Sequence, residues 1–347
     1  MIRKVSHADL ALFAARVFES AGVSRAHAAA WAETLIWANL RGVDSHGVLR
    51  IPRYVELLGT GEINPAPNLQ MLRSAGAIAL LDADRAPGPI AMHRAMEEAI
   101  GLARNVHVGW CVVRGITHAG AVGHFALQAA SAGMVGLVMT ASVPLMAYHG
   151  SKGSVVSTNP IAIAIPAARR APLLLDMATA TVALGKITQA RNSGAAIPPD
   201  WGLDQTGVPT TDPNQVATLM PMAGMKGAGL SLMIECLASL TAANPVIAPA
   251  LSGRTGTNMN GVAIALDIAA FGDQAAFLSD VDTLGDVIAQ QPPAPGFDRL
   301  ALPGERGNAV RAKRERDGIP LPEGTWSGLS RIAAERGIAM PRVIAEV

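Results

Sequence analysis

The chain is poor in cysteine, in aromatic residues and in charge. Its 347 residues include 2 cysteines, and only 4% are aromatic and 16% charged. Cys111 and Cys236 fit neither a disulfide framework nor the spacing of a metal site, which favours a reducing compartment. No continuous apolar run follows the basic pair Arg3 and Lys4, so we expect no signal peptide and a cytoplasmic protein.

An excess of one charge and long apolar runs are also missing. Lysine and arginine number 28 and acidic residues 27, which leaves no electrostatic footprint for nucleic acid or an acidic membrane. The most apolar stretch, residues 132–148, is shorter than a membrane span and is interrupted by Ser142 and Pro144. We interpret it as a buried strand with its loop, and we expect neither nucleic acid nor membrane as a partner.

Apolar residues make up half of the chain, which is enough for a large core. The length corresponds to about two domains of roughly 150 residues. Helical spacing predominates at first, with helix starts at Ser6 and Ser24. Short apolar runs then alternate with alanine-rich segments up to a proline-rich linker at 292–296, which is typical of an α/β layer.

The chain is therefore divided into a helical N-terminal part (1–73), an α/β core (74–296) and a C-terminal part with helices (297–347). Buried strands are expected at 78–81, 110–113, 135–139, 161–165, 173–175 and 262–266. Helices of the core are expected at 90–104, 119–132, 177–192 and 226–242.

The usual dinucleotide-binding fingerprint is absent. A G-x-G-x-x-G turn should follow a strand and open a helix, but the nearest candidate, residues 227–232, lacks the third glycine and follows no strand. Walker A, G-x-S-x-G and H-E-x-x-H patterns are absent too. Without such a motif, these patterns indicate only that the chain is an α/β protein and an enzyme.

The segment Asp44–Arg50 brings three functional groups within about one helical turn of each other. Ser45, His46 and Arg50 supply a hydroxyl, an imidazole and a guanidinium. A 2-hydroxy or 2-oxo acid requires such a set, because its carbinol oxygen exchanges a proton and its carboxylate needs a bidentate partner. The alternative is a serine that caps a helix, beside an ordinary surface histidine and arginine.

A glycine-rich turn, residues 117–124, follows the apolar run that ends at Val113. Such a turn exposes backbone N–H groups at a helix start, where phosphate binds well. His118 is placed to exchange a proton at this turn. The alternative is that the glycines only permit close packing, and for His124 we favour that structural interpretation.

A third set of polar residues lies in the second half of the chain. Asp176 ends a buried strand, where carboxylates often hold nucleotide hydroxyls in open α/β sheets, although it could equally cap the following helix. Lys226 lies in a glycine-rich turn suited to phosphate, and Lys186 follows the strand by ten residues. Glu235 lies in an apolar helix and is interpreted as a buried, paired carboxylate.

Together these segments resemble the malate/L-lactate dehydrogenase family of the non-Rossmann type. That family also holds ureidoglycolate and sulfolactate dehydrogenases, 2,3-diketogulonate reductase and the piperideine- and pyrroline-2-carboxylate reductases. The resemblance covers nearly the whole chain in order. The matching segments are 41–47 with Arg50 and Tyr54, 118–121, 158–162, 175–179, 185–186, 197–198 with Trp201, 209–213, 224–227, 295–297 and 302–305.

The resemblance implies a nicotinamide-dependent oxidoreductase with a malate/L-lactate (sulfolactate) dehydrogenase-like α/β fold. In that fold a mixed-sheet cofactor domain lies beside a helical domain built from both chain ends, and the family forms homodimers. The cofactor would be NAD or NADP, and no metal is implied.

Roles are implied by position in the family's motifs. Ser45 and His46 would form the proton-relay pair, with His118 as a second acid/base candidate. We favour His46, because Ser45 and Arg50 complete a site around it. Substrate contacts would come from Arg50, Thr158 and Lys186. The implied cofactor contacts are His118, Gly120, Ser142, Asp176, Met177, Ala178, Lys226, Gly304, Glu305 and Arg306.

Two departures from the family pattern bear on the substrate. Many members carry tyrosine where this chain has His124. The reductases that act on cyclic imines are thought to use an additional acid after the Asp176 strand, where this chain has Lys186 and Thr188. This favours a small 2-hydroxy acid and its 2-oxo acid as substrates. An NADPH-dependent cyclic ketimine reductase stays as the alternative, and a catalytically idle relative as a third possibility.

Overall fold

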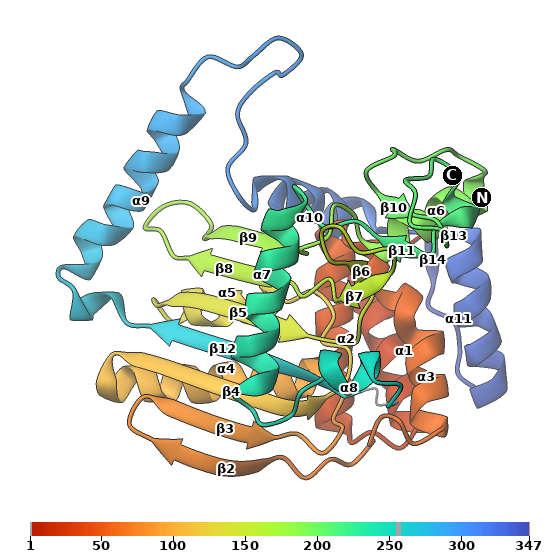
Figure 1. The fold of residues 1–347 in the computed structure, drawn as a ribbon, viewed down its shortest axis with the longest axis horizontal. Coiled ribbons are helices and arrows are strands. Elements are labelled where there is room, and N and C mark those ends of the chain that lie inside the picture. The colour runs from red at the N-terminus through yellow and green to blue at the C-terminus, as the bar shows by residue number, and fades with distance from the viewer. Residues whose placement is uncertain (1, 255–257, 347) are drawn as a thin grey trace.

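The computed structural model describes residues 2–254 and 258–346. Its centre is a seven-stranded sheet in the order β2-β3-β4-β12-β5-β8-β9 (Figure 1). The strands are β2 (Gln70–Ala75), β3 (Ile78–Asp82), β4 (Val108–Ile116), β5 (Val135–Ala141), β8 (Ile161–Ile165), β9 (Leu173–Met177) and β12 (Met259–Leu266). All six strands predicted from apolar runs are present, and the predicted α/β fold is confirmed.

The sheet is mixed. β3 and β4 are parallel and are joined by the crossover helix α4 (Gly88–Val106), as a parallel connection requires. The other neighbouring pairs are antiparallel. β12 reaches the centre of the sheet from the last third of the chain, and its Val262 lies opposite both Val112 and Met139. Segments distant in sequence therefore share one core.

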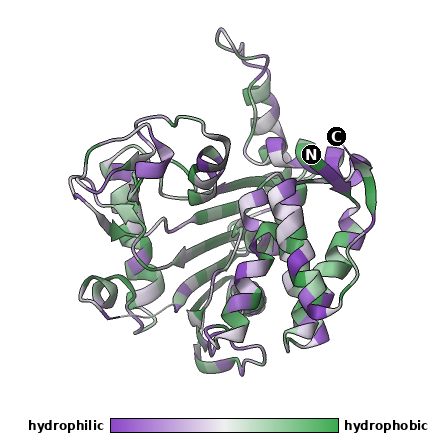
Figure 2. Ribbon diagram, turned by 90° about the vertical axis from the view of Figure 1, so that its right-hand side faces the viewer, coloured by the Kyte–Doolittle hydropathy of each residue, from purple (hydrophilic) through white to green (hydrophobic). Residues whose placement is uncertain are grey.

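Small residues allow the helices to lie close to the sheet. α4 and α5 (Gly123–Ser131) cover one face through a cluster rich in alanine. A Cβ at Gly109 would lie 1.8 Å from Ala99 O, and one at Gly136 would lie 2.3 Å from Ala126 O. In Figure 2 the strands of the large sheet are mainly hydrophobic. This close packing explains how a core with so few aromatic residues is filled.

The opposite face of the sheet is covered only in part, by α7 (Met225–Glu235) and its π-helical continuation Cys236–Leu240 (Figure 1). Glu235 is 4% exposed and accepts hydrogen bonds from the amides of Val246 and Ile247, at the start of α8 (Ile247–Leu251), and from the Ser239 hydroxyl. The prediction of a buried, paired carboxylate is confirmed.

A helical layer beside the sheet is built from both ends of the chain. One hydrophobic cluster joins residues between Val5 and Ile63 to residues between Ile319 and Ala333. Ser6 and Ser24 accept hydrogen bonds from Asp9 N and His27 N, so both predicted helix starts are confirmed. The elements are α1 (His7–Ser20), α2 (Arg25–Leu40), α3 (Ile51–Gly59), α11 (Glu323–Arg336) and the three-stranded sheet of β13 (Ile319–Pro322), β1 (Ile2–Val5) and β14 (Val343–Glu346).

A smaller lobe lies over one end of the large sheet. It contains α6 (Leu184–Ser193) and a four-stranded sheet of β10 (Gly202–Leu203), β11 (Thr218–Leu219), β6 (Met146–Ala147) and β7 (Ser154–Val156). The prediction of a helix at 177–192 is wrong for its first seven residues, because backbone groups there form hydrogen bonds with other segments. Thr179 N donates to Thr158 O, and Thr181 N donates to Met220 O.

Two further boundaries differ from the predictions. The helix expected at 119–132 begins at Gly123, and the expected division after residue 73 falls inside β2. A helix that was not predicted, α9 (Gln274–Ala289), projects from the body with the segment that follows it (Figure 1). Cys111 and Cys236 are free thiols. No described helix has the length and apolar character that spanning a membrane requires.

Candidate active site

Ser45 and His46 lie on a one-turn helix, Asp44–His46, between α2 and α3. Ser45 Oγ is 3.0 Å from His46 Nδ1. A second short turn, Val48–Arg50, follows, and the Arg50 Nε donates to Ser45 O at 2.6 Å. The predicted trio of hydroxyl, imidazole and guanidinium is thus brought together by local backbone geometry.

His118 joins this group from the loop after β4. Its Nδ1 is 2.7 Å from the hydroxyl of Tyr54 on α3, and its ring lies against that of His46 with 5.4 Å between centroids. Sequence reasoning noted Tyr54 in the matching segment but gave it no role. The structure therefore unites two histidines, each held through Nδ1 by a hydroxyl.

Burial keeps both imidazoles neutral. Burial, and then the charge of Arg50, lowers the pKa of His46 to about 4. The pKa of His118 is well below its usual value for the same reasons, with His46 as a further cause. Burial raises the pKa of Tyr54, so its hydroxyl keeps its proton. At neutral pH the site offers two uncharged imidazoles, each able to accept a proton.

Asp176, at the end of β9, accepts a hydrogen bond from Gly123 N at 3.0 Å. It therefore binds the first turn of α5 rather than capping the next helix, as the sequence had left open. Only glycine fits at position 123, since a Cβ there would lie 2.6 Å from Asp176 Oδ2. Burial raises the pKa of Asp176 to about 6, although Gly123 N and the charge of Arg41 oppose the shift.

Arg41 links this carboxylate to the C-terminal part of the chain, a role the sequence did not reveal. It donates to Gly304 O at 3.1 Å and to Asn308 Oδ1 at 2.5 Å, and it stacks over the Trp37 ring. Gly304 precedes α10 (Glu305–Asp317). The guanidinium of Arg41 thus interacts with two predicted cofactor contacts, Gly304 by a hydrogen bond and Asp176 through its charge.

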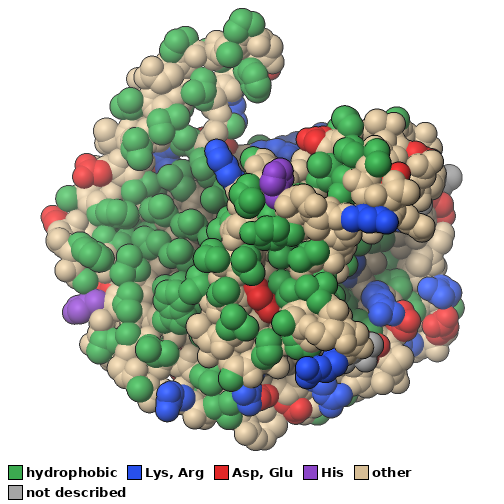
Figure 3. Space-filling view, in the orientation of Figure 1, with side chains coloured by type: hydrophobic (Ala, Val, Ile, Leu, Met, Phe, Trp, Pro, Cys, Tyr) green, Lys and Arg blue, Asp and Glu red, His purple; other side chains and the backbone are tan. Residues whose placement is uncertain are grey.

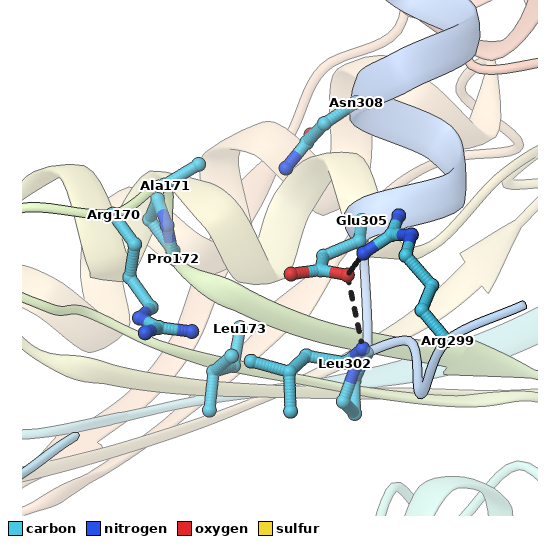
Figure 4. A pocket seen from close by; sticks show the side chains of 9 residues that line it. Arg170, Ala171, Pro172, Leu173, Arg299, Leu302, Glu305 and Asn308 are labelled. Carbon is cyan, nitrogen blue, oxygen red and sulfur yellow. Dashed lines mark hydrogen bonds and ion pairs between the residues drawn. The ribbon is translucent and has the colours of Figure 1, made fainter. Parts of the chain in front are cut away.

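A cavity of about 300 Å³ lies at the other end of β9 (Figure 4). Glu305, in the first turn of α10, faces it, accepts from Leu302 N and pairs with Arg299 at 2.8 Å. Arg306 is exposed and is not among the lining residues. The residues that line the cavity are Arg170, Ala171, Pro172, Leu173, Arg299, Leu302, Pro303, Glu305 and Asn308.

The start of α7 lies beside the segment that follows β9. A Cβ at Gly227 would lie 2.4 Å from Thr179 O, so the first turn of α7, which carries Lys226, packs on the segment that follows Met177 and Ala178. The predicted residues Ser142 and Thr158 lie in neighbouring loops. Thr158 O accepts from Thr179 N. Ser142 Oγ is 2.5 Å from Ser157 Oγ, and Ser142 N donates to Asn159 Oδ1.

Lys186 lies on α6 of the smaller lobe. The adjacent Gly185 packs on the turn Asp44–His46, since a Cβ there would lie 2.6 Å from Ser45 Cβ. The Lys186 ammonium is 5.8 Å from the centre of the Trp201 ring. Gly120, between His118 and α5, has φ +80°, a conformation that favours glycine.

His124 does not join the site. It is 9% exposed and its ring packs against those of Trp37, His93 and Phe125. Burial lowers the pKa of His124 to about 3. The structural interpretation favoured from the sequence fits this position. Over the described ranges, no cluster of three histidine, cysteine or acidic side chains could hold a metal ion.

The family model described as "Malate/L-lactate dehydrogenase" matches residues 5–330. The chain belongs to this family. It is 33% identical to malate dehydrogenase of Pyrococcus horikoshii over 94% of this chain and 93% of that protein. It is 34% identical to ureidoglycolate dehydrogenase (NAD(+)) of Escherichia coli over 89% of this chain and 90% of that protein.

The fold is also that of a solved malate dehydrogenase structure. Malate dehydrogenase from Entamoeba histolytica superposes with a TM-score of 0.93, covering 99% of this chain and 100% of that chain at 26% identity. Membership of the family makes the protein an oxidoreductase of the hydroxy-acid dehydrogenase type that uses a nicotinamide cofactor. It also accounts for the missing G-x-G-x-x-G turn.

Proposed function

We propose that the protein interconverts a small 2-hydroxy acid and its 2-oxo acid with NAD or NADP, with substrates of the malate, lactate, ureidoglycolate or sulfolactate type. The observation that carries the proposal is the pair of neutral histidines beside Arg50. Proton acceptors and a guanidinium meet the needs of a hydroxy acid, which must lose its hydroxyl proton while its carboxylate is held.

In the oxidative direction, the Arg50 guanidinium holds the substrate carboxylate through two N–H donors. His46 takes the hydroxyl proton as the carbon–oxygen double bond forms, and Ser45 fixes the orientation of the imidazole through Nδ1. A nicotinamide cofactor, when bound, would supply the acceptor for the hydride of the carbon that bears this hydroxyl. In the reductive direction His46 returns the proton. His118 lies close enough to share this role.

The residues around β9 fit a nicotinamide dinucleotide. Asp176 at the strand end suits ribose hydroxyls, and Lys226 at the start of α7 suits a phosphate. His118, Gly120, Ser142, Met177 and Ala178 would border the same path. The cavity beside Glu305 has room for a further part of the cofactor. Gly304 and Arg306, the sequence neighbours of Glu305, are the remaining proposed contacts.

The surroundings of the histidines favour a hydroxy acid over a cyclic imine. The imine reductases are thought to use an additional acid in this region, but here the lobe brings Gly185 against Ser45, and the next residue, Lys186, is a base whose ammonium lies near the Trp201 ring. Thr158 and Lys186 are the remaining proposed substrate contacts. The two free cysteines fit the reducing conditions of the cytoplasm, where we place the enzyme.

A substrate panel tests this proposal. Absorbance of NADH and of NADPH would be followed with pyruvate, oxaloacetate, sulfopyruvate, oxalurate, diketogulonate and pyrroline-2-carboxylate. We expect turnover of at least one 2-oxo acid and none of the imine. The variant Arg50→Lys keeps the charge but loses the two-pronged geometry, so its kcat/KM on the preferred acid should fall. Turnover of the imine alone, or a normal Arg50→Lys variant, would contradict the proposal.

We also propose that the enzyme is a homodimer. Apolar side chains gather on the incompletely covered face of the sheet and on the projecting α9 (Figure 3). Ile78, Leu175, Met233, Leu284 and Val287 are each between 40% and 58% exposed. A patch of this kind is unusual on a monomer. Sedimentation velocity should give twice the chain mass, and Leu284→Asp should shift the protein toward the monomer.

A further inference from the structure

Helix α10 is attached to the rest of the molecule mainly by polar contacts. None of its residues is buried. At its start Arg41 binds Gly304 O and Asn308. Near its end Arg314 reaches back to the end of α2 and to the turn that carries Ser45 and His46. Arg314 thus links the last part of α10 to this turn.

Arg314 holds the carboxylate of Asp44 with both of its terminal nitrogens. Nη1 is 2.6 Å from Oδ1 and Nη2 is 3.0 Å from Oδ2, and Nη1 also donates to Asn39 O. The Arg314 side chain is 16% exposed. Two parallel hydrogen bonds between a planar guanidinium and a carboxylate fix orientation as well as distance.

Asp44 is held from a second direction by Asn39, a residue only 2% exposed at the end of α2. Asn39 Nδ2 donates to Asp44 Oδ1 at 2.6 Å, and Asn39 Oδ1 accepts from Val48 N at 2.9 Å. Ser45 and His46 lie between these two anchored positions. The residues of the short helix 44–46 are partly exposed, so these hydrogen bonds, together with the packing of Gly185 on Ser45, hold it in place.

We propose that Arg314, acting through Asp44, is a positioning residue that holds Ser45 and His46 in the geometry for proton transfer. The proposal rests on the proposed function, since it takes His46 as the group that exchanges the proton. Arg314 forms its hydrogen bonds with Asn39 and Asp44 rather than with Ser45 or His46, so it acts on the pair through the carboxylate of Asp44. A displacement of about 1 Å at a reacting group can cost on the order of 100-fold in rate.

The test compares Arg314→Met, Arg314→Lys and Asp44→Asn in the full-length enzyme with its preferred acid. For Arg314→Met we expect kcat to fall by about 10- to 100-fold, with KM for the cofactor within about twofold of wild type. Arg314→Lys keeps the charge but cannot form both hydrogen bonds, so its kcat should lie between those of wild type and Arg314→Met. The kcat of the double variant, Asp44→Asn combined with Arg314→Met, should be no lower than that of the more impaired single variant, because both substitutions remove the same contact.

Arg316→Met is the matched control. Arg316 lies on the same helix, is 72% exposed and forms an ion pair with the neighbouring Asp317. Its kcat and KM should equal those of wild type. Urea midpoints of all variants separate a local displacement from unfolding. If Arg314→Met does not fold, Arg314→Lys with its intermediate kcat carries the test.

The inference is overturned if both Arg314 variants fold and keep wild-type kcat, or if Arg316→Met loses as much. It is also overturned if KM for the cofactor rises in parallel with the loss of kcat. His46→Ala separates this failure from that of the proposed function. An active His46→Ala enzyme removes His46 from the reaction, whereas an inactive one beside an unimpaired Arg314→Met contradicts the positioning role alone.

Discussion

Two histidine rings, those of His46 and His118, pack against each other in this enzyme, and Nδ1 of each ring is hydrogen-bonded to a hydroxyl. Ser45 holds His46 and Tyr54 holds His118. In the proposed reaction each ring would therefore exchange a proton through Nε2. The two rings lie 5.4 Å apart and are not equivalent, because Arg50 binds the backbone of Ser45 and so belongs to the His46 side.

We expect His46→Ala to lower kcat by roughly two to four orders of magnitude, the range for loss of a general acid–base group. Affinity for the reduced cofactor, measured by fluorescence titration, should be nearly unchanged. Ser45→Ala should show a smaller loss, since the imidazole remains. A near-normal His46→Ala enzyme together with an inactive His118→Ala enzyme would transfer the proton-exchange role to His118.

At the scale of elements, the turn between α2 and α3 is shaped by a glycine. A Cβ at Gly47 would lie 2.2 Å from Asn39 Oδ1, the atom that accepts from Val48 N. No side chain fits there unless Asn39 moves, and Asn39 also holds Asp44. The turn is therefore sensitive to a single methyl group.

Gly47→Ala should destabilise the protein by about 1–3 kcal/mol, the usual cost of overpacking, and should also lower kcat. Gly59→Ala is the control, because a Cβ there would meet nothing within 4 Å. Urea unfolding and steady-state kinetics of both variants check this. Equal stability of Gly47→Ala and Gly59→Ala would show that Asn39 can move without consequence.

The sequence reveals elements whose pattern is local and misses those that depend on distant partners. Apolar runs locate the strands to within a few residues, because a buried strand is apolar by itself. The segment 177–183 looks helical but is held by Thr158 and Met220 from other parts of the chain. α9 was missed, and several of its apolar residues, among them Leu284 and Val287, are exposed.

The same distinction applies to the site. Ser45, His46 and Arg50 are neighbours in sequence, so their meeting was predictable. The contact of Asp176 with Gly123 spans 53 residues, and that of Arg314 with Asp44 spans 270. Neither leaves a local pattern. Arg41 and Tyr54 lie inside the matching segment, which was the only signal of their importance.

At the scale of the whole molecule, four histidines are kept neutral by their surroundings. Burial is the largest cause of the lowered pKa in each case. The pKa is about 4 for His46 and about 3 for His124. Asp176 acts in the opposite direction, since its pKa is raised to about 6. The histidines are His46, His93, His118 and His124.

Stability should therefore fall as the pH drops below about 6.5, the ordinary pKa of histidine. Between that value and the lowered pKa, the unfolded chain binds protons that the folded protein excludes. Each such histidine costs roughly 1.4 kcal/mol per pH unit, while Asp176 offsets one of them below pH 6. Urea unfolding at pH 7.5, 6 and 5 measures the slope.

His124→Phe removes one of these groups without touching the proposed site, so its loss of stability between pH 6 and 5 should be smaller than that of wild type. An unchanged slope would mean that His124 gains its proton in the folded protein as readily as in the unfolded chain.

The pairing of β1 with β14 places the first and the last strand of the chain side by side. Arg3 lies opposite Glu346, and their side chains form an ion pair at 3.2 Å. A linker of a few residues could therefore join the two ends, and new ends could be opened in the exposed segment 292–299. A circular permutant opened between Ala294 and Pro295 should fold and turn over the same acid as the original order. A permutant that remains unfolded would show that the order of synthesis, and not only the final contacts, brings β1, β13 and β14 together.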